Sequence, residues 1–175
     1  EILLVGGGIA NTFLKAEGKE IGNSLYSADY VEELKELISI YKEKINTPID
    51  VVVNDNDEIK TINIEDITDT CTIYDIGPKT VEKYVEILKN SNTVFMNGTM
   101  GMYEDENYRA GTELLLRGLT DIKANKVAGG GDAVAAVKKL KYEDAFDFLS
   151  TGGGASLEYI ADKEINCFKG WFKWY

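Results

Sequence analysis

The sequence predicts an α/β fold, in which helices cover a mainly parallel sheet. Short apolar runs alternate with longer amphipathic segments along the chain, and this alternation is typical of parallel sheets. Glycine-rich turns follow three of the predicted strands, which is where α/β proteins commonly bind ligands. No repeat, low-complexity tract or linker interrupts the pattern, and 175 residues are enough for one substantial core. We therefore expect a single domain.

Buried strands are predicted from short, continuous apolar runs. They span residues 2–5, 51–53, 73–76, 93–96, 126–128 and 146–149. Helices are predicted where apolar residues recur every three or four positions between these strands. They span residues 9–16, 28–45, 79–88, 107–117, 133–140 and 155–161, with a short helical turn near Glu143. Residues 54–72 are polar, so we expect a surface excursion or a small hairpin there.

The longest predicted helix, residues 28–45, is indicated by one apolar stripe. The stripe is formed by residues spaced by three and four positions, namely Val31, Leu34, Ile38, Tyr41 and Ile45. Such a stripe is expected to face the core.

Composition excludes several classes of function. The net charge is −11, from 30 acidic and 19 basic residues, and such a surface repels nucleic acids and anionic lipids. The chain has no histidine, and so lacks the usual general base and the usual zinc ligand. Cys71 and Cys167 have no metal-ligand spacing and do not make a disulfide scaffold. We expect a cytoplasmic protein with neither a nucleic-acid nor a membrane partner.

The central motif runs from an apolar strand into Gly129, Gly130, Gly131 and Asp132, and then into a helix. Glycines let the backbone approach a ligand closely, and the start of a helix favours an anion such as phosphate. Asp132 adds a hard oxygen ligand that could hold Mg²⁺. The alternative is a tight turn in which Asp132 is an ordinary N-cap.

Two further glycine turns follow predicted strands, at residues 6–8 and 152–154. Turns at the carboxyl ends of parallel strands form the ligand crevice of such sheets, so three of them favour a phosphate-bearing ligand. The alternative for the last turn is a Ser/Thr cap at residues 150–151, which would only stabilise the final helix.

A different kind of motif spans residues 97–104. It combines the Asn97 amide, the flexible Gly98, the apolar Met102 and the Glu104 carboxylate. A flat base could pack on Met102 while Glu104 accepts hydrogen bonds from ribose hydroxyls, as acidic residues do in other nucleotide sites. The alternative is an exposed loop with Glu104 in the first turn of a helix.

Two common nucleotide motifs do not fit. The dinucleotide fingerprint fails because Asn11 stands where a small residue is needed, and because a long helix follows instead of a strand ending in an acid. A Walker loop is also missing, since no Gly-Lys-Ser/Thr occurs.

Taken together, five segments resemble the C-terminal, nucleotide-binding domain of phosphoglycerate kinases. The likeness covers about residues 2–164, in order, and its segments are residues 5–15, 75–80, 97–101, 129–132 and 150–158. It implies a Rossmann-like three-layer sandwich with a mainly parallel sheet, truncated at its N-terminal side. It also implies that the domain binds MgADP or MgATP.

The resemblance implies a role for each matching residue. Gly7, Gly8, Leu25 and Met102 would line the adenine slot, with Tyr74 at its edge and Glu104 on the ribose. The phosphates would meet a second set of residues, namely Asn97, Gly98, Gly130, Gly131, Asp132 and Ala133. Asp132 would also hold the metal, and the amides of Gly152, Gly153 and Gly154 would steady the phosphoryl group during transfer. The reaction implied is phosphoryl transfer between 1,3-bisphosphoglycerate and ADP in glycolysis.

The chain departs from the family pattern in several places. The N-terminal domain that binds phosphoglycerate is absent, as is a Gly-Gly-Ala-Lys segment, so residues 1–164 are expected to be an incomplete nucleotide-binding domain without turnover alone. Thr99 and Ala133 replace the usual proline and hydroxyl residue. We expect the full enzyme to be a monomer. Residues 165–175 form an atypical aromatic tail, either an artefact or a segment folding back on the core.

An alternative of a different class stays open. The chain could be a non-catalytic nucleotide-binding or interaction module derived from the same fold. Its aromatic tail would then dock a partner, because exposed aromatic clusters mark interfaces.

Overall fold

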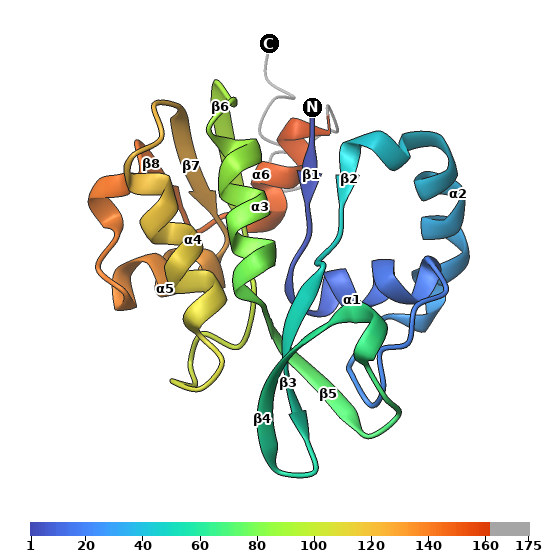
Figure 1. The fold of residues 1–175 in the computed structure, drawn as a ribbon. Coiled ribbons are helices and arrows are strands. Elements are labelled where there is room, and N and C mark those ends of the chain that lie inside the picture. Colours follow the sequence, from blue (N-terminus) through green and yellow to red (C-terminus); the bar gives the residue numbers. More distant parts are fainter. Residues whose placement is uncertain (162–175) are drawn as a thin grey trace. The chain divides into compact units, whose positions relative to one another are not determined.

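The computed structural model describes residues 1–161, so the aromatic tail predicted at residues 165–175 lies outside the described residues. Helices and strands alternate from residue 71 to residue 160, whereas three strands follow one another between residues 45 and 63 (Figure 1). They form two compact units. The first unit comprises Glu1–Asn90 and Thr99–Ile122, and the second comprises Ser91–Gly98 and the described residues from Lys123 onward. No helix in the described residues is long and apolar enough to cross a membrane.

The first unit contains two small sheets. Strands β1 (Leu3–Leu4) and β2 (Ile45–Asn46) form a parallel pair. The other sheet is antiparallel, in the order β4-β3-β5, and its strands are β3 (Asp50–Asp55), β4 (Glu58–Asn63) and β5 (Cys71–Ile76). The helices of this unit are α1 (Gly7–Ala16), α2 (Val31–Tyr41), α3 (Pro78–Leu88) and α4 (Ala110–Thr120). Short 3₁₀ turns lie at Ala28–Tyr30, Lys42–Lys44 and Ile64–Asp66.

The second unit is built on one parallel sheet. Its strands lie in the order β6-β7-β8 and are β6 (Thr93–Asn97), β7 (Asn125–Gly129) and β8 (Phe148–Ser150). Its helices are α5 (Gly131–Lys139) and α6 (Gly153–Ile160), with a 3₁₀ turn at Glu143–Ala145. The described structure is therefore an α/β fold with parallel sheets and helices, as the sequence predicts.

The prediction of parallel strands is wrong for residues 50–76, where β3, β4 and β5 are antiparallel. For β3 and β4 the reason is a two-residue turn at Asn56 and Asp57, whose φ angles are 51° and 67°. Two consecutive residues with positive φ match the twist of a hairpin, and Asn and Asp tolerate this conformation better than other side chains. The hairpin expected within residues 54–72 is thus present, but it also includes the preceding strand.

The predicted helix at residues 28–45 is too long. The α-helix spans Val31–Tyr41 between two 3₁₀ turns, and Ile45 begins β2 instead. Leu34, Ile38 and Ile45 pack against buried Val5, Ala10 and Phe13, so most of the predicted stripe does face the core. Tyr41 is an exception, because it is exposed. The other predicted elements are present with shifted ends, and α4 begins at Ala110 rather than 107.

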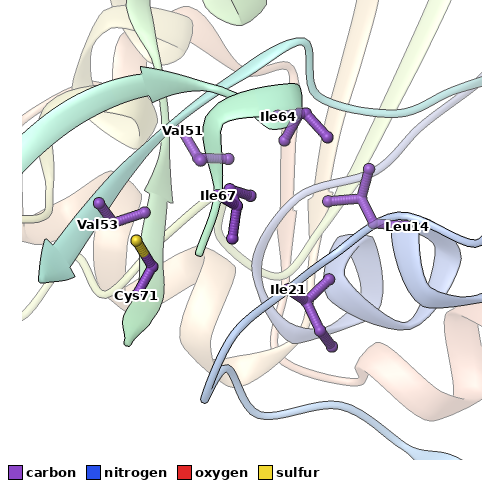
Figure 2. Packing of buried hydrophobic residues seen from close by; sticks show 7 residues of the cluster. All are labelled: Leu14, Ile21, Val51, Val53, Ile64, Ile67 and Cys71. Atoms are coloured by element: carbon purple, nitrogen blue, oxygen red, sulfur yellow. The ribbon is translucent and has the colours of Figure 1, made fainter. Parts of the chain in front are cut away.

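One hydrophobic cluster joins the antiparallel sheet to α1 (Figure 2). It consists of side chains from β3 and β5, from the segment after β4, and from α1 and the turn beyond it, namely Val51, Val53, Cys71, Ile64, Ile67, Leu14 and Ile21. Full burial of one aliphatic side chain of this size contributes about 1.5–3 kcal/mol. The hairpin is therefore part of the core of its unit, and not only a surface excursion.

Asp50, a buried residue at the start of β3, caps helix α3. Its carboxylate accepts hydrogen bonds from the backbone N–H groups of Lys79 (3.1 Å) and Thr80 (2.7 Å), in the first turn of the helix. The N-cap position itself is occupied by Gly77, where a Cβ would collide with the Asp50 carboxylate. A side chain from a neighbouring strand thus satisfies amides that a local cap would otherwise satisfy.

Asp75, near the end of β5, does the same for helix α4. Its carboxylate accepts hydrogen bonds from the N–H groups of Gly111 (2.6 Å) and Ile76 (2.9 Å), and its side chain is buried. Helices α3 and α4 also pack on each other, and Gly118 leaves room for Val85 at their contact. Two aspartates on the paired strands β3 and β5 therefore fix the starts of two packed helices.

Tyr84 connects α3 to the parallel strand pair. Its ring is fully buried, and its hydroxyl oxygen lies 2.8 Å from the carbonyl oxygens of both Val5 and Asn46. Burial raises the pKa of this phenol, so it stays protonated as a hydrogen-bond donor.

We expect Tyr84→Phe to lower the free energy of unfolding by about 1–3 kcal/mol, the cost of a buried acceptor that loses its donor. Tyr30→Phe is the control, because Tyr30 is exposed, and it should change the free energy by less than about 0.5 kcal/mol. Urea titrations of both variants, followed by circular dichroism, measure the difference. Equal effects of the two substitutions would contradict a structural role for the Tyr84 hydroxyl.

We also expect Asp75 to make stability depend on pH. Burial raises the pKa of its carboxyl from 3.8 to about 7, against the hydrogen bonds from Gly111 and Ile76, which lower it. The folded chain therefore holds this proton more tightly than the unfolded chain between about pH 4 and pH 7. Hence the contribution of Asp75 to stability falls as the pH rises through this window, by at most about 1.4 kcal/mol per pH unit.

The measurement is the free energy of unfolding across this window for the wild type and for Asp75→Asn, which cannot titrate. The wild-type value minus the variant value should decline with rising pH and become constant above about pH 7. A difference that is independent of pH, or that rises, would show that Asp75 does not titrate as its burial implies.

Candidate functional site

The register of the parallel sheet aligns the ends of three strands in the second unit. Asn97 at the end of β6 pairs with Gly129 at the end of β7, and Gly129 pairs with Ser150 at the end of β8. Because parallel strands end at the same edge of a sheet, the loops that follow them start side by side. These loops carry the predicted residues at 97–98, 130–133 and 152–154.

The backbones of these loops are in close contact. A Cβ on Gly130 would lie 2.9 Å from Asn97 Oδ1, and a Cβ on Gly153 would lie 2.7 Å from the Gly130 Cα and 3.1 Å from Asn97 Oδ1. The Gly130 N–H also donates to the Ser150 carbonyl oxygen, at 2.9 Å. Gly130 has a φ of 95°, which disfavours other residues. The structure thus brings Asn97, Gly130 and Gly153 together.

Two helices begin at this cluster. The N-cap of α5 is Gly130, and Asp132 lies inside the first turn, so the alternative that Asp132 is the N-cap is wrong. The N-cap of α6 is Gly152, whose N–H donates to the Ser150 hydroxyl at 3.3 Å. A Cβ on Gly131 or Gly154 would meet no atom of the described residues within 4 Å. Polarised amides next to open space are suited to an anion.

The surroundings of Asp132 fit a magnesium ion whose other ligands are water and substrate phosphates. Asp132 is exposed at the start of α5, next to Ala133, which is fully buried. The described residues contain no group of three or more carboxylate, cysteine or histidine side chains that could hold a metal by themselves. Magnesium commonly binds one or two carboxylates and completes its shell with water and substrate phosphates. One carboxylate beside an anion site therefore fits this ion.

In the first unit, the glycine turn at residues 6–8 meets the segment that follows residue 98. The Gly7 N–H donates to the Met100 carbonyl oxygen, at 2.8 Å, and a Cβ on Gly6 would lie 2.8 Å from the Met100 Cα. The Met102 N–H donates in turn to the Tyr74 carbonyl oxygen, at 2.9 Å. Backbone hydrogen bonds therefore link the segment around residues 100–102 to Gly7 on one side and to Tyr74 on the other. This segment contains Met102, so three predicted residues are grouped here.

Helix α1 holds Leu25 near this turn. The Asn11 amide donates to the Leu25 carbonyl oxygen at 3.0 Å, and the Thr12 hydroxyl accepts the Ser27 N–H at 3.1 Å. The Leu25 side chain itself is 82% exposed. A Cβ on Gly8 would meet no described atom within 4 Å. The start of α1 thus presents open backbone with an apolar side chain held nearby.

Met102 and Glu104 lie in the loop before α4, and both are exposed. Because α4 begins at Ala110, Glu104 is not in a first helical turn, and that part of the alternative is wrong, whereas the exposed loop that it assumed is present. Thr99, which replaces a proline of the family pattern, donates its hydroxyl hydrogen to the Gly101 carbonyl oxygen at 2.9 Å. A side-chain hydrogen bond therefore supports the turn at this position.

Two residues that hold this loop in place, Asp75 and Thr112, were not predicted from the sequence. Asp75 accepts the Gly111 N–H, and the buried Thr112 hydroxyl accepts the Met100 N–H at 3.1 Å. The available signal was an aspartate within the apolar run of residues 73–76, because a buried carboxylate needs hydrogen-bond partners. Thr112 gave no such signal.

Comparison with known proteins gives one consistent result. The family model described as phosphoglycerate kinase matches residues 1–163. The chain is 44% identical to the phosphoglycerate kinase of Francisella philomiragia over 172 residues, which cover 94% of this chain and 44% of that protein. It is 47% identical to the phosphoglycerate kinase of Lactobacillus gasseri over 167 residues, which cover 93% of this chain and 41% of that protein.

Solved structures agree. The phosphoglycerate kinase of Coxiella burnetii matches with a TM-score of 0.86 and 36% identity, over 92% of this chain and 44% of that chain. The enzyme of Pyrococcus horikoshii matches with a TM-score of 0.84 and 31% identity, over 96% of this chain and 44% of that chain. The chain thus spans less than half the length of these relatives. On the family match and these identities, it belongs to the phosphoglycerate kinase family.

Proposed function

We propose that this chain is the nucleotide-binding part of a phosphoglycerate kinase, corresponding to the C-terminal domain of the family. In the whole protein it would bind MgADP or MgATP for phosphoryl transfer between 1,3-bisphosphoglycerate and ADP. The phosphoglycerate would bind to the part of the protein outside this chain. We propose a monomeric, cytosolic glycolytic enzyme.

The observation that carries this proposal is the meeting of three loops in the second unit. Asn97, Gly130 and Gly153 lie so close together that a Cβ on either glycine would collide with a neighbour. They meet because the register of β6, β7 and β8 aligns the ends of these strands. Two helix starts lie at this point. Such an arrangement supports phosphate binding, because amides and aligned peptide dipoles stabilise negative charge there.

Each part of this cluster has a proposed role. The amides of Gly130, Gly131 and Ala133, with the Asn97 side chain and Gly98, bind the phosphates of the nucleotide. Asp132 holds Mg²⁺, which when bound neutralises charge on the phosphate oxygens. The amides of Gly152, Gly153 and Gly154 orient the phosphoryl group that is transferred. Phosphoryl transfer depends mainly on positioning and charge stabilisation, so the absence of histidine is no obstacle.

The first unit supplies the proposed base and ribose contacts. Gly7 and Gly8 offer backbone that a flat ring can approach, Leu25 and Met102 offer apolar surface, and Tyr74 lies at the edge. Glu104 accepts hydrogen bonds from the ribose hydroxyls. The backbone connections of Gly7 through Met100 and of Met102 to Tyr74 support this grouping.

We expect Asp132→Asn to weaken the binding of MgADP by about tenfold or more, the lower bound of what even outer-shell partners of a metal contribute. Binding of ADP in EDTA should change much less, because asparagine loses mainly the charge that the cation prefers. The melting temperature without ligand should stay almost constant, since Asp132 is not the cap of α5. Calorimetric titrations with Mg²⁺ and with EDTA measure both affinities.

Asp144→Asn is the matched control, since Asp144 is also an exposed aspartate of the second unit but lies outside the proposed site. Its MgADP affinity should equal that of the wild type. Equal losses for Asp132→Asn with and without metal would show that Asp132 is not the metal ligand. Wild-type chain that binds neither ADP nor MgADP would refute the proposed function.

A further inference from the structure

We propose that Asp75 is a positioning residue for the nucleotide, which holds the segment Thr99–Thr112 so that Met102 and Glu104 can receive the base and ribose. This inference rests on the proposed function, since Met102 and Glu104 are the residues assigned to the nucleoside. Asp75 does not itself contact the nucleotide in this proposal. It acts through the backbone of the segment.

The Asp75 carboxylate touches the segment near both of its ends. At the far end it accepts the Gly111 N–H at 2.6 Å, in the first turn of α4. At the near end it packs against Gly101, directly before Met102. A Cβ on Gly101 or on Gly111 would collide with the Asp75 side chain. The segment is therefore folded closely over this one carboxylate.

Neighbours of Asp75 hold the same segment at intermediate points. The Met102 N–H donates to the Tyr74 carbonyl oxygen at 2.9 Å. The Tyr74 and Tyr108 rings pack with their centroids 4.5 Å apart, and the Asn54 amide donates to the Tyr108 hydroxyl at 3.3 Å. The backbone around Met102 and Glu104 is thus fixed from β5, while both side chains are exposed.

The carboxylate of Asp75 has more partners than a simple cap requires. A cap needs only the hydrogen bond to the first turn of the helix, which Gly111 provides. The tight packing on Gly101 adds a second constraint, on a loop that carries two candidate ligand residues. Replacing the carboxylate by an amide puts an NH2 group in place of one carboxylate oxygen. This NH2 group would face the N–H of either Gly111 or Ile76, and two donors that face each other repel. The segment should then move away from β5.

Asp50 provides a matched control within the same unit. It is likewise a buried aspartate on a neighbouring strand, and it likewise accepts N–H groups from the first turn of a helix, α3. No residue assigned to the nucleotide lies on α3 or next to Asp50. A general loss of helix capping should therefore affect both variants alike, whereas a loss of positioning should affect only Asp75→Asn.

The experiment measures the binding of ADP and of inorganic pyrophosphate to the full 175-residue chain, by calorimetry at about pH 8, where Asp75 is mainly ionised, and at a temperature where circular dichroism shows each variant folded. Asp75→Asn should weaken ADP binding by about tenfold, the effect of the one charged hydrogen bond to the ribose that a displaced Glu104 would lose. Its pyrophosphate affinity should stay within about twofold of the wild type, because the proposed phosphate ligands lie elsewhere in the sequence. Asp50→Asn should leave both affinities within about twofold.

A second pair of variants covers the case in which Asp75→Asn does not fold. Gly101→Ala keeps the carboxylate but inserts a methyl group against it, and it should weaken ADP binding without weakening pyrophosphate binding. Gly118→Ala inserts a methyl group against Val85 in the same unit, and it should change neither affinity.

Three results would overturn the inference. The first is unchanged ADP affinity in both Asp75→Asn and Gly101→Ala. The second is an equal loss of ADP affinity in Asp50→Asn, which would indicate general capping. The third is an equal loss of pyrophosphate affinity in Asp75→Asn. A wild-type chain that binds no ADP would instead refute the proposed function, and the inference with it.

Discussion

Hydrogen bonds that buried aspartates accept from the starts of helices organise the first unit. Asp50 and Asp75 lie on paired strands β3 and β5, and each accepts the first-turn amides of one helix, α3 or α4. A buried carboxylate is costly unless it is fully hydrogen-bonded, so each helix must start where its amides meet the carboxylate. This requirement fixes two helices against the sheet and, through α4, the loop that carries Met102 and Glu104.

Glycine has the complementary role in both units, because it permits contacts that a Cβ would prevent. Gly101 and Gly111 lie against Asp75, Gly130 and Gly153 lie against each other, and Gly6 lies against Met100. These contacts bring loop backbones together where ligand residues are proposed. At other glycines, such as Gly131 and Gly154, a Cβ would meet only open space among the described residues, so packing does not require glycine there. Glycine thus permits close packing at some positions and lies beside open space at others.

Much of this molecule could be predicted from the sequence by itself, because the decisive signals are local. Apolar runs gave the strands, periodic apolar residues gave the helices, and glycine turns after strands indicated where a ligand could bind. The family resemblance rested on the same segments and agrees with the comparisons. The meeting of the turns at residues 130 and 153 also followed from local information, since parallel strands end at a common edge.

Tertiary structure decided what depends on contacts between distant residues. Pairing with Leu3 drew Ile45 out of the predicted helix into β2, and the Asn56–Asp57 turn made β3 and β4 antiparallel. The remote caps of α3 and α4 could not be predicted, because each aspartate is 29 or more positions away from the helix amides that it caps. Sequence patterns report the preferences of a segment, whereas a buried carboxylate is satisfied by whichever amides the fold brings within hydrogen-bond distance.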